Sequence, residues 1–259
     1  MVIKHIQKRL RKGYKMQNYY ELKTPRGIMR GFFHQPISQK YPVCLIFHGF
    51  TGCCTGTKFS YVQLARKLEA SDIGTIRLDF LGSGESDLNF RDMTFKDELE
   101  CAEILLEEVM KMKNIQGVYL LGHSMGGALA SELAKKYPHQ IQKLCLWAPA
   151  LNLPEAIEYL TGQVEQADEY DHNGFMISDD FVKDICQRDF YQGLDIYQNA
   201  LMIIHGNQDR TVPYEISNQY LPRFHQPIFH CIQDGTHNFD NIKHIQEVID
   251  YSYQFLISE

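Results

Sequence analysis

The 259-residue sequence lacks any apolar run of the roughly 18 residues that a membrane-spanning helix requires. Its first 15 residues hold six Lys or Arg and no acid, and no apolar segment typical of a secretory signal follows them. We therefore expect no stable membrane insertion. We interpret residues 1–15 as an appended or disordered tail, with Met16 as the functional start of the chain.

The sequence also lacks the cysteine and histidine spacings that are typical of metal sites and disulfide frameworks. Its seven cysteines are odd in number, and the adjacent Cys53 and Cys54 match no ligand pattern. Unpaired cysteines favour a reducing compartment. The sequence therefore predicts a cytoplasmic protein without a metal ion or another cofactor.

No internal repeat or low-complexity tract divides the chain, and 44% of its residues are hydrophobic, enough for one full core. Short apolar runs alternate with segments of helical periodicity. This alternation predicts an α/β fold with a mostly parallel sheet that helices cover on both faces. Residues 27–33 are expected to add an antiparallel edge strand. The predicted strands cover residues 42–47, 74–80, 117–122, 142–147, 200–204 and 227–232, and the predicted helices cover 58–69, 93–113, 124–137, 215–221 and 239–257.

The stretch from Val118 to Gly127 is the most informative part of the sequence. An apolar run typical of a strand leads to Ser124, and small residues with helical periodicity follow it. Gly122 and Gly126 stand two residues before and two residues after the serine, a spacing that permits a sharp strand-to-helix turn. Because the pattern Gly-x-Ser-x-Gly also arises by chance, the interpretation of Ser124 as a nucleophile depends on partners elsewhere in the chain.

A serine nucleophile needs a base, and the base needs a carboxylate that orients it. Asp209 follows one predicted strand, and His237 lies in the loop after the last predicted strand. The order serine, acid, base along the chain favours Asp209 as the acid and His237 as the base. Asp234 and Asp79 are rival acids, but Asp234 is so close to His237 in sequence that a role in the turn is favoured.

Two backbone N–H groups are predicted to stabilise the oxyanion that forms when a serine attacks a carbonyl group. Met125 N–H lies at the start of the helix that follows Ser124, and Phe50 N–H lies in the loop after the first predicted parallel strand. His123 and His205, by contrast, are interpreted as packed or backbone-bonded residues without a catalytic role.

Five segments together carry a family resemblance: residues 48–52, 77–87, 122–127, 205–209 and 235–237. They resemble the α/β-hydrolase superfamily, and within it the chain is most similar to bacterial cinnamoyl/feruloyl esterase-like proteins. The resemblance runs from about Tyr19 to the C-terminus. We therefore expect residues 16–150 and 196–259 to form an α/β-hydrolase core, and residues 151–195 to form a lid inserted into it.

The chain departs from the pattern of these esterases in two regions. Cys53 and Cys54 stand where the esterases usually carry polar residues, close to the expected oxyanion loop. The resemblance also implies a lid tyrosine that helps to hold the phenolic end of the substrate, and Phe181 occupies that place here. The expectation of hydroxycinnamate specificity therefore comes from the resemblance and not from the residues.

Residues 151–195 concentrate the negative charge of the chain. The segment holds eleven Asp or Glu and two Lys or Arg, whereas the whole chain has a net charge of −6. An acidic lid disfavours polyanionic substrates such as nucleic acid or phosphorylated acyl carriers, although a solvated helical face has the same composition. Aromatic residues are interspersed in the segment and would line an acyl pocket or form a core of the lid. We expect Tyr159, Phe181 and Tyr191 to bind the substrate.

The motifs favour a serine carboxylesterase that hydrolyses small to medium carboxylic esters through an acyl-enzyme, and the resemblance adds hydroxycinnamoyl esters. Alternatives on the same fold are a monoacylglycerol-lipase-like hydrolase and an aminopeptidase-like hydrolase, in which the acidic lid would hold a substrate amine. A non-catalytic ligand-binding member is disfavoured because no member of the triad is missing. The expected partner is a small-molecule ester and not a nucleic acid. The sequence leaves a homodimer open.

Overall fold

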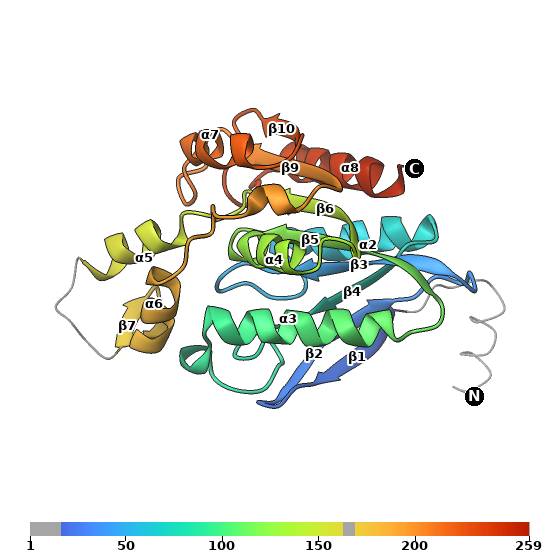
Figure 1. Cartoon of the computed structure of the whole chain (residues 1–259), viewed down its shortest axis with the longest axis horizontal. Helices are drawn as coiled ribbons and strands as arrows, with labels where there is room; N and C mark the ends of the chain where they lie inside the picture. The colour runs from blue at the N-terminus through green and yellow to red at the C-terminus, as the bar shows by residue number, and fades with distance from the viewer. Residues whose placement is uncertain (1–16, 163–168, 259) are drawn as a thin grey trace.

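The structure, a computed structural model, describes residues 17–162 and 169–258. Its centre is an eight-stranded sheet with the order β1-β2-β4-β3-β5-β6-β9-β10 (Figure 1). The pairs from β4 to β10 are parallel, whereas β2 pairs antiparallel with both β1 and β4. The strands are β1 (Gln17–Lys23), β2 (Ile28–His34), β3 (Tyr41–Phe47), β4 (Gly74–Leu78), β5 (Ile115–His123), β6 (Ile141–Trp147), β9 (Ala200–Gly206) and β10 (Ile228–Ile232).

The predicted mostly parallel α/β sheet is confirmed, but the prediction of its edge was wrong. The segment predicted as an edge strand forms β2, which lies one strand inside the edge, and β1 forms the edge itself. The reason is that β1 buries little: Leu22 is its one buried residue, and Tyr19 is 57% exposed. Its position depends on backbone hydrogen bonds to β2, and such bonds leave no hydrophobic pattern in the sequence.

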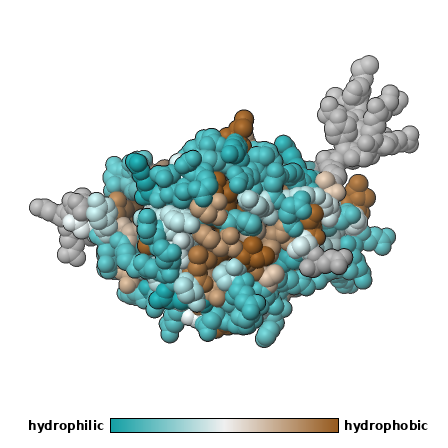
Figure 2. Space-filling model, turned by 90° about the horizontal axis from the view of Figure 1, so that it is seen from above, coloured by the Kyte–Doolittle hydropathy of each residue, from teal (hydrophilic) through white to brown (hydrophobic). Residues whose placement is uncertain are grey.

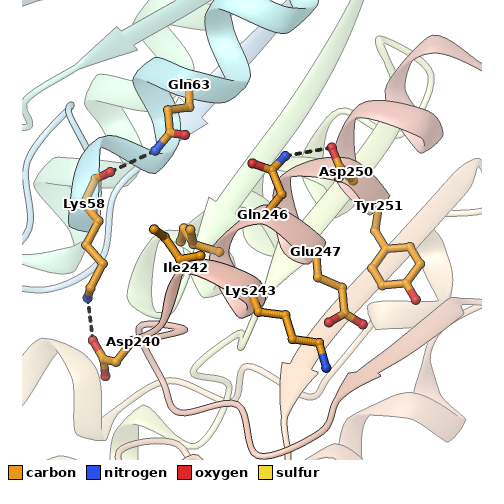
Figure 3. A pocket seen from close by; sticks show the side chains of 10 residues that line it. Lys58, Gln63, Asp240, Ile242, Lys243, Gln246, Glu247, Asp250 and Tyr251 are labelled. Carbon is orange, nitrogen blue, oxygen red and sulfur yellow. Dashed lines mark hydrogen bonds and ion pairs between the residues drawn. The ribbon is translucent and has the colours of Figure 1, made fainter.

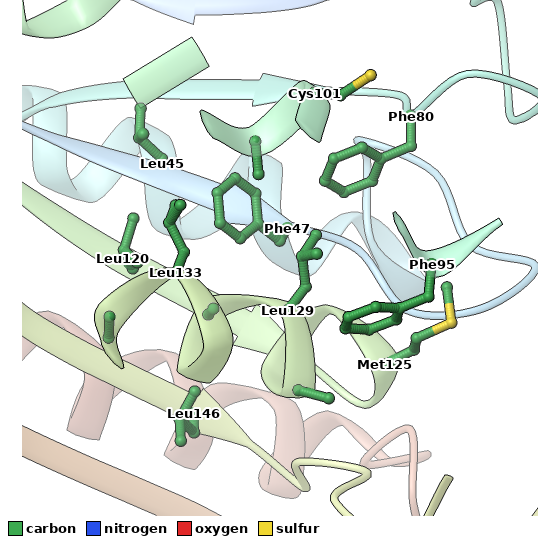
Figure 4. Close-up of a cluster of buried hydrophobic side chains, with 14 of the residues drawn as sticks. Leu45, Phe47, Phe80, Phe95, Cys101, Leu120, Met125, Leu129, Leu133 and Leu146 are labelled. Carbon is green, nitrogen blue, oxygen red and sulfur yellow. The ribbon is translucent and has the colours of Figure 1, made fainter. Parts of the chain in front are cut away.

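The two faces of the sheet bury two separate groups of side chains. Leu45 and Phe47 of β3 belong to one hydrophobic cluster, while Cys44 and Ile46 belong to the other. This alternation is the two-residue period of a strand that is buried on both faces. Helices α3 (Phe95–Met110) and α4 (Met125–Lys136) complete the first cluster, which Figure 4 shows, and α2 (Ser60–Ala70) and α8 (Ile242–Ile257) complete the second.

Most predicted helices exist, with ends set by recognisable caps. Thr94 caps α3 by accepting a hydrogen bond from Asp97 N–H, and Asn241 caps α8 in the same way. The helix predicted at 215–221 is instead divided into short helical elements. Pro222 follows directly, and it has no N–H with which to extend an α-helix. The short elements are η1 (Thr57–Phe59), η2 (Phe90–Asp92), η3 (Leu194–Ile196), η4 (Tyr214–Ile216), α7 (Ser217–Tyr220) and η5 (Leu221–Arg223).

The segment between β6 and β9 stands apart from the main layers at one end of the molecule (Figure 1). It contains α5 (Leu153–Thr161), the antiparallel hairpin of β7 (Glu169–His172) and β8 (Phe175–Ser178), and α6 (Asp179–Cys186). We call these four elements the lid. Residues 163–168 lie outside the described residues. The predicted tail at residues 1–15 and the predicted functional start at Met16 also lie outside them.

None of the helices in the described ranges is both long and apolar enough to cross a membrane. The face that Figure 2 shows is mostly hydrophilic, with a limited apolar area near its middle.

A buried carboxyl group on α3 generates a prediction about stability. Glu98 is 3% exposed, and its Oε2 has no hydrogen-bond partner among the described residues. Burial, with a smaller effect of Asp97, raises the pKa of the Glu98 carboxyl to about 8. In the unfolded state the carboxyl group loses its proton near the ordinary pKa of glutamate, about 4.3. The folded state keeps this proton up to a pH of about 8. Between these two pH values, Glu98 therefore lowers the stability of the fold progressively as the pH rises.

We expect Glu98→Gln to raise the melting temperature by several degrees at pH 8 and to change it little at pH 4.5, because the amide stays neutral at both pH values. Thermal melts of both proteins from pH 4.5 to 8.5 would measure this difference. A gain that is equal at all pH values would show that Glu98 is not protonated in the folded state.

Candidate active site

The turn between β5 and α4 places Ser124 in an unusual backbone conformation. Ser124 has φ 58° and ψ −123°, a strained geometry for a residue other than glycine. The turn is tight: a Cβ atom on Gly122 would lie 2.1 Å from Gly126 O, and one on Gly126 would lie 2.3 Å from Phe47 O. Glycine is therefore required at both positions, and the Ser124 side chain projects at the carboxyl end of β5.

The structure brings together the three side chains that the sequence analysis proposed. His237 Nε2 lies 2.9 Å from Ser124 Oγ, and His237 Nδ1 lies 2.7 Å from Asp209 Oδ2. Asp209 follows β9 and His237 follows β10, so loops at the carboxyl ends of neighbouring strands supply both. With the Nδ1 proton donated to the carboxylate, Nε2 is free to accept the hydroxyl proton of Ser124.

Several donors hold the Asp209 carboxylate in its ionised form. Burial opposes ionisation, but hydrogen bonds from His205 and His237 outweigh it, and the pKa of Asp209 is well below its usual range. The second carboxylate oxygen accepts the Thr211 and Val212 N–H groups, each at 2.9 Å. A buried anion beside the imidazole is therefore present at all but strongly acidic pH.

His205 and His123 touch the site, a contact that the sequence analysis did not assign. His205 Nε2 lies 3.2 Å from Asp209 Oδ2 and 3.0 Å from Val212 O, so this nitrogen carries the proton and donates it. His123 Nε2 lies 3.0 Å from His237 O, and burial together with His237 lowers the pKa of His123 to about 3. His205 thus positions Asp209, and His123 positions His237. The sequence signal for both was their place directly before or after a glycine of a site motif.

Hydrogen bonds in the loop after β3 fix the orientation of the peptide group between Gly49 and Phe50. His48 Nε2 accepts the Phe80 N–H at 3.0 Å, so His48 Nδ1 carries the proton and donates it to Gly49 O at 2.9 Å. Gly52 N–H donates to the same oxygen at 2.9 Å. Because C=O and N–H of a trans peptide point in opposite directions, these bonds fix the direction of the Phe50 N–H.

This loop also passes directly against the serine. A Cβ atom on Gly49 would lie 2.9 Å from Ser124 Cβ. Neither the Phe50 N–H nor the Met125 N–H donates to an acceptor within residues 17–162 and 169–258. Both predicted oxyanion donors are therefore free to bind a ligand oxygen.

The rival acids have other partners. Asp234 has φ 57°, and its N–H donates to Asn207 Oδ1, which fits a role in the turn. Asp79 accepts the N–H groups of Cys54 and Glu85 and so holds the loop after β3 to the loop after β4. Neither carboxylate contacts His237.

Two cavities meet at the serine. One has a volume of about 410 Å³ and is lined by His237, Asn238, Thr57 and the loop after β3, while the other has a volume of about 560 Å³ and is mostly apolar. The residues that line both are Phe50, Ser124, His172 and Thr211. The wall between the cavities is partly aromatic, since the Phe50 and His172 rings lie 5.8 Å apart.

The three predicted substrate-binding residues have different places. Phe181 is buried and lines the 560 Å³ cavity, where its ring stacks on Phe50 at 5.3 Å. Tyr159 lines the same cavity and is 75% exposed. Tyr191 lines neither cavity: its ring packs on the core and under the Arg223 guanidinium at 5.1 Å. Substrate binding by Tyr191 therefore stays a prediction, without support from the lining of these two cavities.

A larger hollow, of about 1040 Å³, lies between α2 and α8, away from Ser124 (Figure 3). Its polar side chains pair with one another, as Lys58 does with Asp240 at 2.7 Å and Gln246 with Asp250 at 3.1 Å. No polar groups converge there on a common point. In the parts of the chain that the structure describes, no three His, Cys, Asp or Glu side chains are placed to hold a metal ion.

Comparisons with known proteins agree with this fold. The sequence profile of the family described as serine aminopeptidase, S33, matches residues 38–171. The structure of Est1E from Butyrivibrio proteoclasticus with ferulic acid bound has a TM-score of 0.85 and 25% identity, covering 92% of this chain and 98% of that chain.

Curated relatives match over shorter regions. A Bacillus subtilis (strain 168) protein that bears the name of a 2-succinyl-6-hydroxy-2,4-cyclohexadiene-1-carboxylate synthase is 33% identical over 111 residues, 43% of this chain and 37% of that protein. Lipase 1 of Psychrobacter immobilis is 31% identical over 122 residues, 45% of this chain and 36% of that protein. The chain thus spans little more than a third of the length of these two relatives.

The tight turn at the serine predicts a specific loss of stability. In Gly126→Ala the new methyl group would collide with the carbonyl oxygens of Phe47 and His48, at 2.3 and 2.5 Å, so we expect destabilisation of about 3 kcal/mol or more. Gly174→Ala is a matched control, because Gly174 has open space around it and φ 87°, and backbone strain alone should lower stability by about 1 kcal/mol. Urea unfolding curves of both variants would measure the difference, and equal losses would contradict the close approach.

Proposed function

Because the chain belongs to the α/β-hydrolase family described as serine aminopeptidase, S33, we propose that it is a serine esterase acting through an acyl-enzyme on Ser124. The observation that carries the proposal is the hydrogen-bonded chain from Ser124 through His237 to the ionised Asp209, at 2.9 and 2.7 Å. This chain stands beside two unoccupied N–H donors and an apolar cavity. Together these groups supply a base, a stabiliser of negative charge and a place for an acyl group.

In the proposed first step, Ser124 Oγ attacks the ester carbonyl carbon while His237 Nε2 takes the hydroxyl proton. The carbonyl oxygen becomes an anion, which the N–H groups of Phe50 and Met125 receive. His237 then gives its proton to the departing alcohol, and the acyl group stays on Ser124. Asp209 remains ionised throughout and stabilises the imidazolium.

In the second step, His237 takes a proton from a water molecule, and the resulting hydroxide attacks the acyl carbon. The oxyanion again lies between the Phe50 and Met125 N–H groups. When it collapses, the bond to Ser124 Oγ breaks and His237 returns the proton to the serine. The acid leaves and the free enzyme is restored.

The two cavities support an assignment of the two parts of the ester. His237 lines the 410 Å³ cavity and not the other, and His237 must reach the oxygen of the leaving alcohol. The alcohol therefore belongs in the 410 Å³ cavity. The 560 Å³ cavity, with Leu153, Ile157 and Phe181 in its lining, takes the acyl group, and we call it the acyl cavity. Its volume suits an aromatic ring or a medium-length chain.

The substrate class that we propose is a neutral ester with an aromatic or medium-length acyl group, including cinnamate and ferulate esters. The likeness to Est1E with ferulic acid bound supports an aromatic acyl group. Phe181 lines the acyl cavity without a hydroxyl, so it cannot distinguish a phenol from an unsubstituted ring. The acidic residues of the lid, among them Glu155 and Asp171, disfavour the phosphates of acyl carriers.

An aminopeptidase is the second candidate, because the family description names one and Glu155 lines the acyl cavity. Arg210 lines the same cavity and would repel a substrate ammonium group. We therefore rank the ester above the aminoacyl amide.

We predict that Ser124→Ala, His237→Ala and Asp209→Asn each lower kcat for an ester by about a thousandfold or more, and that the double variants lose little beyond the single ones. The three residues act as one unit, so their effects are not additive. Asp234→Asn is the matched control and should keep kcat within about twofold, because Asp234 lies in a turn and does not contact His237. Steady-state rates with p-nitrophenyl butyrate would measure this, and an equal loss in Asp234→Asn would remove the assignment of Asp209.

The substrate proposal predicts a rank order of kcat/KM under one buffer condition. Methyl cinnamate and methyl ferulate should be hydrolysed within about threefold of each other, and p-nitrophenyl butyrate and both cinnamates should exceed a long-chain monoacylglycerol and an aminoacyl amide. Ser124→Ala from the same purification corrects for contaminating esterases. A preference for the monoacylglycerol would favour the lipase alternative, and a preference for the amide would favour the aminopeptidase.

A further inference from the structure

One buried polar side chain in the acyl cavity has no hydrogen-bond partner among the described residues. Asn152 is 8% exposed and lines this cavity together with Ser124 and Met125. Its Oδ1 is enclosed, and no group within residues 17–162 and 169–258 forms a hydrogen bond with it. The other polar residues of the lining, such as Thr211 and Glu155, are more exposed and reach water. Asn152 therefore differs from these residues, because water does not reach its Oδ1 to form a hydrogen bond.

The fold itself does not use this side chain. Asn152 is the N-cap residue of α5, where an asparagine oxygen ordinarily accepts an N–H from the first turn of the helix. Here the side chain makes no capping hydrogen bond, and only the backbone oxygen of Asn152 accepts the Ala156 N–H, at 3.0 Å. A buried amide oxygen without a hydrogen-bond partner destabilises a protein. A ligand group that pairs with the amide would remove this penalty.

The position of Asn152 indicates which part of an acyl chain it meets. The segment that leads to it is bonded to the serine, since Ala150 N–H donates to Ser124 O at 3.0 Å. Asn152 therefore lies at the serine end of the acyl cavity, whereas Tyr159 lines it farther along α5 and is largely exposed. When the ester carbonyl lies at Ser124, the next carbons of the acyl group lie at this end of the cavity.

We propose that Asn152 is a specificity-determining residue that binds a hydroxyl group on one of the first carbons of the acyl chain, so that hydroxyacyl esters are the favoured substrates. The inference rests on the proposed esterase function. A hydroxyl group suits the amide because it donates to Oδ1 and accepts from Nδ2. A purely hydrocarbon chain in the same place leaves the amide unpaired.

The test compares p-nitrophenyl butyrate with its 2-hydroxy and 3-hydroxy forms in the wild-type chain and in Asn152→Leu, which keeps the side-chain size and removes both polar atoms. Each kcat/KM is divided by the rate of the same ester in hydroxide alone, which removes the intrinsic reactivity. We expect the wild type to favour at least one hydroxy ester over butyrate by about tenfold or more, and Asn152→Leu to abolish this preference while it retains or gains activity on butyrate.

Two further variants separate recognition from stability. Asn218→Leu, at an exposed position of α7, is the matched control and should keep the wild-type preference. Asn152→Asp retains an acceptor for the hydroxyl proton and should keep part of the preference if Asn152→Leu folds poorly, which a thermal melt would reveal. Two results would overturn the inference while the esterase proposal stands. One is a wild type that shows no preference for a hydroxy ester once kcat/KM is divided by the hydroxide rate. The other is a preference that Asn152→Leu leaves unchanged. No turnover of any ester would overturn the esterase proposal and this inference with it.

Discussion

The close approach of β5 and α4 at Ser124 is the constraint on which the rest of the site depends. Two glycines let the backbone fold over itself there, and Gly126 also packs against the carbonyl oxygens at the end of β3. The same contact therefore fixes the serine, the first N–H groups of α4 and the start of the loop that carries Phe50. A side chain at this point would shift all three together, because they share one packed junction.

The electrostatics of the site follow from burial and from neutral neighbours. Asp209 is an anion in the interior because N–H donors and two imidazoles surround it. His48 and His123 stay neutral, since burial lowers the pKa of both rings, and each can then direct one N–H to one carbonyl oxygen. A charge on the His123 ring, which lies beside His237, would compete with a His237 imidazolium for the negative charge of Asp209. The proposed mechanism therefore needs a single mobile proton, between Ser124 and His237.

Local sequence patterns predicted the parallel strands well, because a strand buried on both faces is a continuous apolar run, as in β3. They also identified Ser124, Asp209 and His237, since strand ends of a parallel sheet meet at one edge and the structure brings these side chains together. The place of β1 at the edge, outside β2, the packing of Tyr191 and the unpaired amide oxygen of Asn152 were not predicted. Each depends on contacts between segments distant in sequence, which hydrophobic periodicity does not encode.

Aromatic contacts join the lid to the loop after β3: the Phe50 ring meets both His172 and Phe181. The Phe50 ring stacks on Phe181 at 5.3 Å and lies 5.1 Å from Phe90, whose ring is 4.8 Å from Phe175 of the hairpin. The Phe50 ring thus faces the lid, while its N–H is the proposed oxyanion donor. Substitutions in the lid that resize the acyl cavity would press on this residue. Under the proposed mechanism, pocket shape and transition-state stabilisation are coupled through Phe50, and changes of specificity that spare Phe181 and His172 should disturb catalysis least.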